Sequence, residues 1–489
     1  MVHVSDRVVL AKRPPVLDET RLGRLVFLPT VAAGSMGAVA MLLPPRIGLY
    51  VVAGVTIVWA YWVTVSRGNQ YLTPSGIFAI AAGIFLGAGS LYLGLLGSDF
   101  LNDGDLRDTA VIVLVTTMAT DAVCVAISIK RHVHWPARGP AAATKEERTA
   151  LRASFRSPAQ FEAKGIALVL VSKLPIIVAL GDAISPALGL VGILMLALGF
   201  SSLRQRIRWA GDAVIALLAL VVPAYWISTV YSGYGRLSLA GMGLAVFAAW
   251  NIIRPLRLQK VALVLALPGL LLFMGESRRE LQNKDPRRET QEAGVGVGLE
   301  SVYNPIETLT QITVEHDFPG GTSVGPRYGA TFVNTLLLPV PRSWWPGKPK
   351  GFGAELTELI LPSLVSIGHS MAALSQGEWY ANFGWPGLVM MPLAIGWFLA
   401  RCDGWHAGII RTGFTDPHTW YSTVTLLCIM SSIGEIFWVG TFTFFNRGGL
   451  AAVFAAAIAA FSLRRTSRAS LSTSHVDGNE GPAAMAAEG

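Results

Sequence analysis

Apolar runs of about 18–22 residues recur along this chain, and each is long enough to cross a lipid bilayer as a helix. Hydrophobic residues make up 52% of the sequence and charged residues only 14%, against about 25% charged residues in an average soluble domain. Inside lipid, a single apolar run satisfies its own backbone groups only by forming a helix. The sequence therefore predicts an all-α fold, that of a polytopic membrane protein.

These runs divide the chain into five predicted parts. Residues 1–24 form a cytoplasmic N-terminus, residues 25–274 hold nine spanning helices, and residues 275–384 form a large extracytoplasmic loop. Three more spans occupy residues 385–463, and residues 464–489 form a polar, disordered cytoplasmic tail. The twelve expected spans cover residues 25–43, 47–65, 77–96, 109–129, 165–180, 186–203, 213–230, 237–253, 261–274, 385–400, 420–433 and 450–463.

Positive charges favour one orientation of this topology. The chain carries 39 Lys and Arg against 31 Asp and Glu, a formal charge of +8. Lys and Arg concentrate after the fourth, sixth, eighth and last expected spans, which places those links and both chain ends in the cytoplasm. The polar N-terminal stretch shows no cleavable signal peptide, so we expect the first span to direct insertion. An excess of this kind belongs to cytoplasmic loops, and we expect no nucleic-acid partner.

Two ionisable residues stand clearly within the expected spans, Asp121 and Lys173. Such groups are costly in lipid and usually face the protein interior or water. The two side chains could pair or hold a lipid headgroup; alternatively, both lie near the cytoplasmic ends and extend to the surface. Three cysteines, far apart in the sequence, suggest neither a disulfide framework nor a metal site (Cys124, Cys402 and Cys428).

The stretch 325–387 differs sharply from the rest of the chain. It reads GPRYGATFVNTLLLPVPRSWWPGKPKGFG and, after a gap, GHSMAALSQGEWYANFGWPG, rich in Pro, Gly, Trp and cations. An irregular backbone of this kind lies outside the bilayer or lines a cavity. Its cations suit an anionic ligand, and its aromatic side chains suit a membrane interface or the face of a sugar. The cations are Arg327, Arg342, Lys348 and Lys350, and the aromatic residues are Tyr328, Trp344, Trp345, Trp379 and Tyr380.

The beginning of the large loop carries a second group of cations. Arg278 and Arg279 stand in GESRRELQNKDPRRE, directly after the ninth expected span. They could contact a headgroup or diphosphate, since a guanidinium matches phosphate oxygens with two bonds. Alternatively, they belong to a solvated helix that extends past the membrane. The nearby triplet Glu315, His316 and Asp317 is expected to be a surface loop and not a metal motif.

At PRSWWPGKP and GEWYANFGWPG the chain resembles the O-antigen and oligosaccharide repeat-unit polymerases of bacterial envelopes. The segments YLTPSG, GPRYGATFVN and GEIFW…NRGG agree with the resemblance. It implies transfer of a growing glycan from undecaprenyl diphosphate onto the sugar end of a new lipid-linked repeat unit, for O-antigen, capsule or exopolysaccharide. It also implies an active site on the outer face of the bacterial inner membrane and no metal, cofactor or nucleotide sugar. The implied partners are the undecaprenyl-diphosphate-linked oligosaccharide, the lipid bilayer and, as a further candidate, a chain-length regulator.

The resemblance and the chemistry together assign candidate roles. Arg327 and Arg342 resemble the family's outer-loop arginines, and Glu378, Tyr380, Asn382 and Gly384 resemble the motif that leads into the tenth span. A diphosphate leaving group needs cations, and an attacking hydroxyl needs a base. The candidate cations are Arg327, Arg342, Lys348, Lys350, Arg278, Arg279 and Arg447; the candidate bases are Glu378, then His369, then Glu435; the candidate sugar contacts are Tyr328, Trp344, Trp345, Tyr380 and Asn382.

Two of these residues have simpler alternative roles. Glu378 could cap the N-terminus of the tenth span, where a carboxylate favours the helix dipole. Asn382 could equally hold a sugar hydroxyl or satisfy the backbone at that helix start.

Four other classes of protein are alternatives to a polymerase. A transporter or flippase fits twelve spans, but the sequence shows no repeated halves and few ionisable residues in its spans. A polyprenyl-phosphate-sugar transferase would need acidic residues in its first outer loop, and here that loop is Pro44–Arg46. A non-catalytic scaffold would not need so many cations and aromatic residues in one loop. An O-antigen ligase shares the donor, the topology and the cationic loop, and it stays open.

Overall fold

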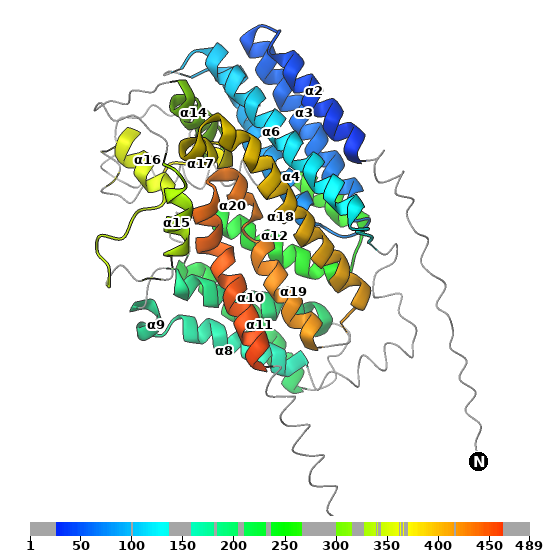
Figure 1. Ribbon diagram of the computed structural model, residues 1–489. Helices are drawn as coiled ribbons and strands as arrows, with labels where there is room; N and C mark the ends of the chain where they lie inside the picture. The colour runs from blue at the N-terminus through cyan, green and yellow to red at the C-terminus, as the bar shows by residue number, and fades with distance from the viewer. Residues whose placement is uncertain are drawn as a thin grey trace, which may run out of the picture.

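The computed structural model describes residues 26–98, 101–135, 158–179, 183–203, 210–230, 236–266, 300–314, 327–338, 344–360, 370–414 and 417–462, with residues 340, 362 and 365. Every regular element in these residues is a helix (Figure 1). The all-α prediction is therefore confirmed for the part of the chain that the structure describes.

Six helices among the described residues are long and apolar enough to cross a membrane. They are Pro45–Ser66, Pro74–Leu96, Asp103–Lys130, Trp385–Thr412, His418–Trp438 and Thr441–Ser462. Four shorter apolar helices accompany them, at Leu28–Ala40, Ile184–Phe200, Ala213–Ser228 and Leu239–Ile253. All ten of these helices fall on segments that were predicted to span.

The N-terminal helices form one tightly packed group. They are α2 (Leu28–Ala40), α3 (Pro45–Ser66), α4 (Pro74–Ala82), the π-helical segment η2 (Gly83–Ala88), α5 (Gly89–Leu96) and α6 (Asp103–Lys130). Proline stands in the first turn of α3 and of α4, where its missing N–H needs no partner. The side chain of Thr73 caps α4, and Asn102 caps α6. These local signals explain why the helices begin where they do.

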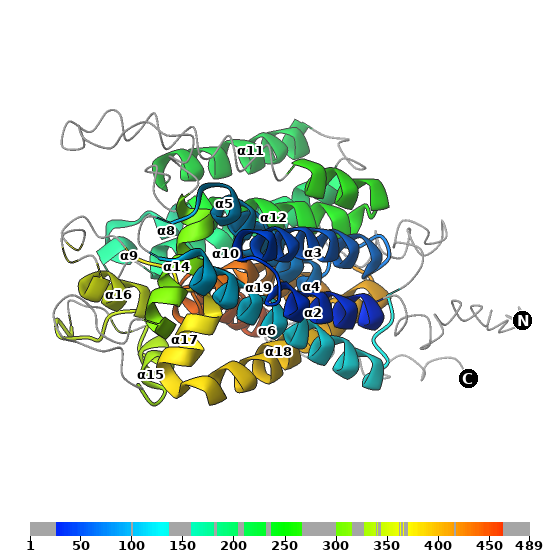
Figure 2. The same ribbon diagram turned by 90° about the horizontal axis from the view of Figure 1, so that it is seen from above.

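The middle of the chain adds α8 (Pro158–Ser172), α9 (Pro175–Ala179), α10 (Ile184–Leu203), α11 (Ala210–Val230), α12 (Arg236–Ile253) and a helix at 257–266. Helices α8 and α10 approach closely, since a Cβ on Gly165 would lie 2.9 Å from the carbonyl oxygen of Gly192. The prediction of one helix at 165–180 is wrong, because the chain breaks at Lys173 and Leu174, directly before Pro175. Seen from above, α11 lies at one edge of the bundle and α18 (Trp385–Thr412) at the opposite edge (Figure 2).

The predicted outer loop contains four helices in its described residues: α14 (Glu300–Val314), α15 (Ala330–Leu336), α16 (Phe352–Ile360) and α17 (Leu374–Phe383). They gather at one end of the bundle (Figure 1), where α14 packs against α5 and α6. None of the four is among the helices long enough to span. The loop is thus a folded cap on the end of the bundle at which α6 begins.

The C-terminal region corrects two predictions. Helix α18 continues to Thr412, so the first part of the predicted loop between residues 401 and 418 is helical. The segment between the expected spans at 420–433 and 450–463 was predicted to be a polar connection, but it consists of short helical turns. These are α20 (Ile433–Trp438), α21 (Thr441–Phe444) and η5 (Phe445–Gly449), which lie between α19 (Pro417–Met430) and a helix at 450–462. Both errors have the same cause: polar residues in these segments indicated loops, whereas the bundle buries these residues and forms hydrogen bonds with them.

Candidate functional site

Glu378 lies in the middle of α17 and is fully buried. Its Oε1 accepts a hydrogen bond from the hydroxyl of Thr331 in α15 at 3.0 Å, and its Oε2 accepts one from the backbone N–H of Thr441 in α21 at 2.6 Å. Burial raises the pKa of this carboxyl, against the smaller effect of the bonds from Thr441 and Thr331. Glu378 therefore links three helices. It does not cap the tenth predicted span, since Gly384, at φ 64°, separates α17 from α18.

Asn382 completes this cluster one turn later in α17. Its Nδ2 donates to Thr331 Oγ1 at 2.8 Å and to the carbonyl oxygen of Glu378 at 2.7 Å. Its Oδ1 is buried and has no hydrogen-bond partner in the part of the chain that the structure describes. The amide thus holds Thr331 toward the carboxylate and leaves one acceptor unused.

Gly440 is a site residue that the sequence analysis missed. Its φ is 110°, and a Cβ at this position would lie 2.3 Å from Glu378 Oε2. Only glycine allows the turn before α21 to bring the Thr441 N–H onto the carboxylate. The sequence signal was present in the VGTF turn, but its importance depends on contact with α17.

Arg327 and Tyr328 are clamped onto the C-terminal end of α17. The N–H of Arg327 donates to the carbonyl oxygen of Ala381 at 2.9 Å, and that of Tyr328 donates to the carbonyl oxygen of Asn382 at 3.0 Å. The Arg327 guanidinium pairs with Glu355 of α16, and both side chains are 23% exposed. The backbone of this predicted diphosphate contact is therefore bonded to α17 one turn after Glu378, and its guanidinium is partly exposed and paired with a carboxylate.

Lys348 and Lys350 face different partners. Lys348 is buried, and its Nζ donates to the carbonyl oxygens of Leu338 and Val340 at 3.0 and 2.9 Å. Lys350 is half-exposed and pairs with Glu358 of α16. Lys348 thus holds the chain after α15 in place, and Lys350 is the better placed of the two to meet an anion.

Glu435 and Arg447 pair with each other at the end of the bundle near α17. Glu435, on α20, is 2% exposed, and no described residue forms a hydrogen bond with its Oε2. Arg447 is partly exposed and pairs with Glu435 Oε1. Helix α20 packs against α17, so the third candidate base stands in the neighbourhood of the first.

The predicted sugar contacts divide into exposed and packed side chains. Tyr328 is 83% exposed and Trp344 is 75% exposed, while Trp345 is partly exposed. Tyr380 is half-buried and meets Trp385 edge to face, with ring centroids 5.5 Å apart. Exposed rings at the rim of a membrane protein suit an interface or a sugar, whereas Tyr380 is committed to packing.

Four predicted site residues lie outside the described residues: His369, Arg342, Arg278 and Arg279. The triplet at 315–317 lies outside them as well. Among the residues that are described, no group of three or more His, Cys, Asp or Glu side chains is placed to hold a metal ion.

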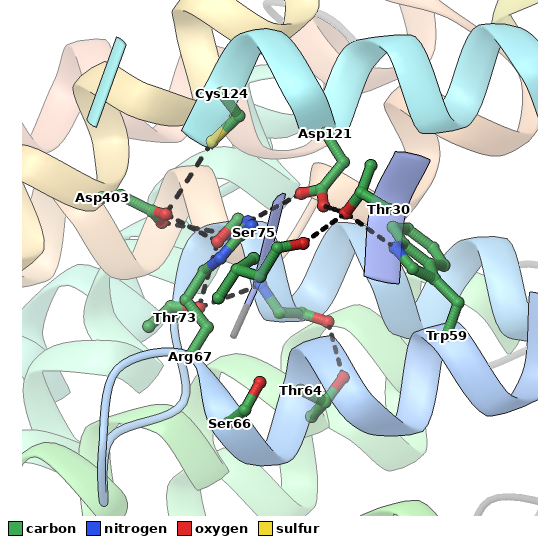
Figure 3. A network of polar contacts seen from close by, with 12 residues as sticks. Thr30, Trp59, Thr64, Ser66, Arg67, Thr73, Ser75, Asp121, Cys124 and Asp403 are labelled. Atoms are coloured by element: carbon green, nitrogen blue, oxygen red, sulfur yellow. Dashed lines mark hydrogen bonds and ion pairs between the residues drawn. The ribbon is translucent and has the colours of Figure 1, made fainter. Parts of the chain in front are cut away.

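A second polar cluster lies inside the helical bundle (Figure 3). Arg67 Nη1 donates to Asp121 Oδ1 at 2.8 Å, and the hydroxyl of Thr30 donates to Asp121 Oδ2 at 2.6 Å. Asp403 of α18 accepts bonds from the backbone N–H and the hydroxyl of Ser75. Two of the alternatives considered for Asp121 are therefore wrong: it does not pair with Lys173, and it does not extend to the surface.

Lys173 instead stands 5.4 Å from the ring centroid of Trp226, at the break between α8 and α9. Arg67 and Asp403 were not predicted as members of a site. Arg67 was assigned to a link between two spans, and Asp403 was assigned to a loop. Their only sequence signal was a charge beside a long apolar run.

No protein-family model, curated protein or solved structure matches this chain. The residues of the site are therefore the basis for inferring a function. The cap on the bundle contains a buried carboxylate, an arginine held by its backbone, an exposed lysine and exposed aromatic rings. Such a set can take a proton from a hydroxyl and bind an anionic leaving group.

Proposed function

We propose that this chain is a membrane glycosyltransferase that polymerises lipid-linked oligosaccharide repeat units. In this proposal the chain crosses the bacterial inner membrane twelve times, and the cap formed by α14–α17 faces outward. The growing glycan leaves undecaprenyl diphosphate and joins a hydroxyl at the sugar end of the incoming repeat unit.

One observation carries the proposal: the backbone of Arg327 is bonded to α17 about one turn from Glu378. The carbonyl that accepts from the Arg327 N–H belongs to Ala381, three residues after Glu378 and thus about one turn along α17. Arg327 then meets the diphosphate as negative charge develops on it, and Glu378 takes the hydroxyl proton. A carboxyl whose pKa is raised by burial is a better proton acceptor than an ordinary glutamate.

The ion pairs of α16 fit the same proposal. Glu355 and Glu358 lie three residues apart on α16, hence on one face, and they hold Arg327 and Lys350. A diphosphate offers more negative charge than a carboxylate and accepts two bonds from a guanidinium at once. The carboxylates thus occupy the place of the anion until the lipid-linked donor displaces them.

The test is elongation of lipid-linked repeat units by the purified chain in vesicles. Bonds to charged groups contribute roughly 1.5–3 kcal/mol, so Arg327→Ala is expected to slow elongation roughly tenfold to over a hundredfold. Arg327→Lys should recover only part of the rate, because an ammonium lacks the paired contact. Glu378→Gln, which keeps its size but takes no proton, should abolish transfer. Normal elongation by Arg327→Ala would refute this assignment of the site.

Arg46→Ala is the matched control. Arg46 stands at the same end of the bundle and pairs with Asp103 at 2.8 Å, but it is far more exposed and lies outside the cap. Its loss should leave elongation unchanged. Glu355→Gln tests the competition: it should lower the KM for the lipid-linked donor, since Arg327 then needs no displacement.

Surface glycan in cells separates the proposal from its alternatives. With Arg327→Ala, a polymerase leaves single repeats in place of a ladder. A ligase leaves long chains on the lipid carrier, and a flippase leaves repeats on the cytoplasmic face. Either of the last two patterns would refute polymerisation while keeping the site.

A further inference from the structure

The cluster inside the bundle contains more carboxylates than it pairs with cations. Arg67 at the end of α3, Asp121 of α6 and Asp403 of α18 are each at most 4% exposed. Asp121 takes the hydrogen bond of the guanidinium, and Asp403 has no cationic hydrogen-bond partner among its contacts in the described residues. A buried, ionised carboxylate without such a partner is strongly unfavourable, and a proton removes its charge.

The hydrogen bonds around Asp403 can form whether its carboxyl group is ionised or protonated. The carboxyl Oδ1 accepts from the Ser75 N–H at 3.0 Å, and Oδ2 lies 2.6 Å from Ser75 Oγ. Ser75 Oγ in turn lies 3.2 Å from Thr73 Oγ1, and either atom can donate. With Asp403 ionised, the serine donates to it; with Asp403 protonated, the acid donates to the serine, which then donates to Thr73. No hydrogen bond is lost in the exchange.

A small cavity lies beside this cluster. Its volume is about 10 Å³, close to the least that holds one water molecule. It is lined by Val26, Arg67, Val125, Ser128, Trp135 and Asp403. Arg67 Nη2 and Ser128 Oγ are buried and have no hydrogen-bond partner among the described residues, so a water here would bond both of them beside the carboxyl.

Other titratable groups stand around Asp403 on the elements packed against it. They are Arg67 and Asp121 already described, Cys124 of α6 with its Sγ 4.0 Å from Oδ2, the neighbouring Cys402, His406 one turn later in α18, and Lys260. Lys260 Nζ donates to the carbonyl oxygens of Arg67 and Tyr71, and His406 Nδ1 accepts from Trp135 Nε1. None of these bonds joins a cation to Asp403.

We propose that Asp403 is a proton-binding site inside the bundle, which exchanges its proton with a water held between Arg67 and Ser128. The ligand is a proton carried by water: hydronium gives its proton to the carboxylate, and a carboxylic acid and a water molecule result. The site is separate from the cap and does not rest on the proposed polymerase activity.

Infrared difference spectroscopy of the full chain in lipid tests this directly. The carbonyl stretch of a protonated carboxylic acid should be present in the unaltered chain, weaken as pH rises, and disappear in Asp403→Asn. Asparagine keeps the shape and the bonds to Ser75, so this variant should fold. Asp103→Asn, which removes a partly exposed carboxylate that pairs with Arg46, must leave this part of the spectrum unchanged. A difference spectrum between the unaltered chain and Asp403→Asn without such a band, at every pH, would show that Asp403 is ionised and overturn the proposal.

Deuterium exchange tests the role of the cavity. In heavy water the Asp403 band should shift, and Ser128→Ala should slow that shift by removing a partner of the water. The matched control is Ser90→Ala, because Ser90 Oγ is also buried without a partner but does not line this cavity. Equal exchange rates in the unaltered chain and both variants would refute the exchange route. Should Asp403→Asn not fold, Ser75→Ala replaces it, since loss of that hydroxyl must change the frequency of a band that belongs to Asp403.

Discussion

The two polar clusters of this molecule hold their ion pairs in opposite ways. In the bundle, Arg67 and Asp121 pair at 2.8 Å and are 4% and 3% exposed. In the cap, Arg327 and Glu355 are each 23% exposed, and Lys350 and Glu358 are 46% and 40% exposed. Water can replace a lost partner in the cap but not in the bundle. The pairs of the cap are thus open to exchange, as the proposed binding of a diphosphate requires, whereas the pair of the bundle is shielded from water.

The largest expected effect follows from breaking the bundle pair. Asp121→Asn leaves the Arg67 charge buried without a carboxylate hydrogen-bonded to it, and removal of one partner from a buried pair costs about 3–5 kcal/mol. Glu358→Gln, which breaks the most exposed pair of the cap, should cost at most about 1 kcal/mol. Unfolding in detergent micelles, followed by helical circular dichroism, measures both variants. Equal losses would show that the two clusters do not differ in the way described.

A double variant sharpens this result. Replacing Arg67 by Met and Asp121 by Leu removes both charges at once, and apolar replacements of a buried pair are often neutral. The double variant should therefore be more stable than Asp121→Asn alone. If it is less stable, the pair itself and not the unpaired charge supplies the stability.

A smaller effect is expected at the turn that closes the cap. Gly440→Ala places a Cβ 2.3 Å from Glu378 Oε2 and forces alanine into a φ of 110°. Strain of this kind costs roughly 1–3 kcal/mol. The matched control is Gly243→Ala in α12, where a Cβ meets nothing within 4 Å and alanine favours the helix by roughly 0.5–1 kcal/mol. Thermal unfolding should move in opposite directions for the two variants, and a stabilised Gly440→Ala would contradict the described contact.

The apolar helices were predicted well from the sequence, because the length of an apolar run is enough to identify a span. Residues 47–65 and 109–129 were expected to span, and α3 and α6 contain them. Helix α18 was placed too short, since Asp403 and His406 looked like loop residues. Both side chains are bonded inside the bundle, to Ser75 and Trp135, and a partner that far away in sequence leaves no local pattern.

The residues of the candidate site could be predicted from the sequence, but their bonding partners could not. The motif around Glu378 and the cations near Arg327 stood out by composition, and the structure bonds the backbone of Arg327 to the helix that carries Glu378. The sequence did not indicate that Lys348 bonds backbone carbonyls, or that α16 supplies Glu355 to Arg327. Those facts depend on how short helices fold onto one another, which a stretch rich in Pro and Gly does not encode by periodicity.

The smallest effect concerns the pH dependence of stability at Glu378. Burial raises the pKa of this carboxyl in the folded chain above its value in the unfolded chain. The folded state therefore binds the proton more tightly, and stability falls as pH rises from the ordinary pKa of glutamate through the raised one. The slope for one proton is at most about 1.4 kcal/mol per pH unit within that window. Glu378→Gln cannot titrate, so its unfolding curve should lack this part of the slope, whereas Glu358→Gln should retain it. An unchanged slope in Glu378→Gln would mean that Glu378 stays ionised in the folded chain, which would align it with the exposed acids of the cap and not with the buried acids of the bundle.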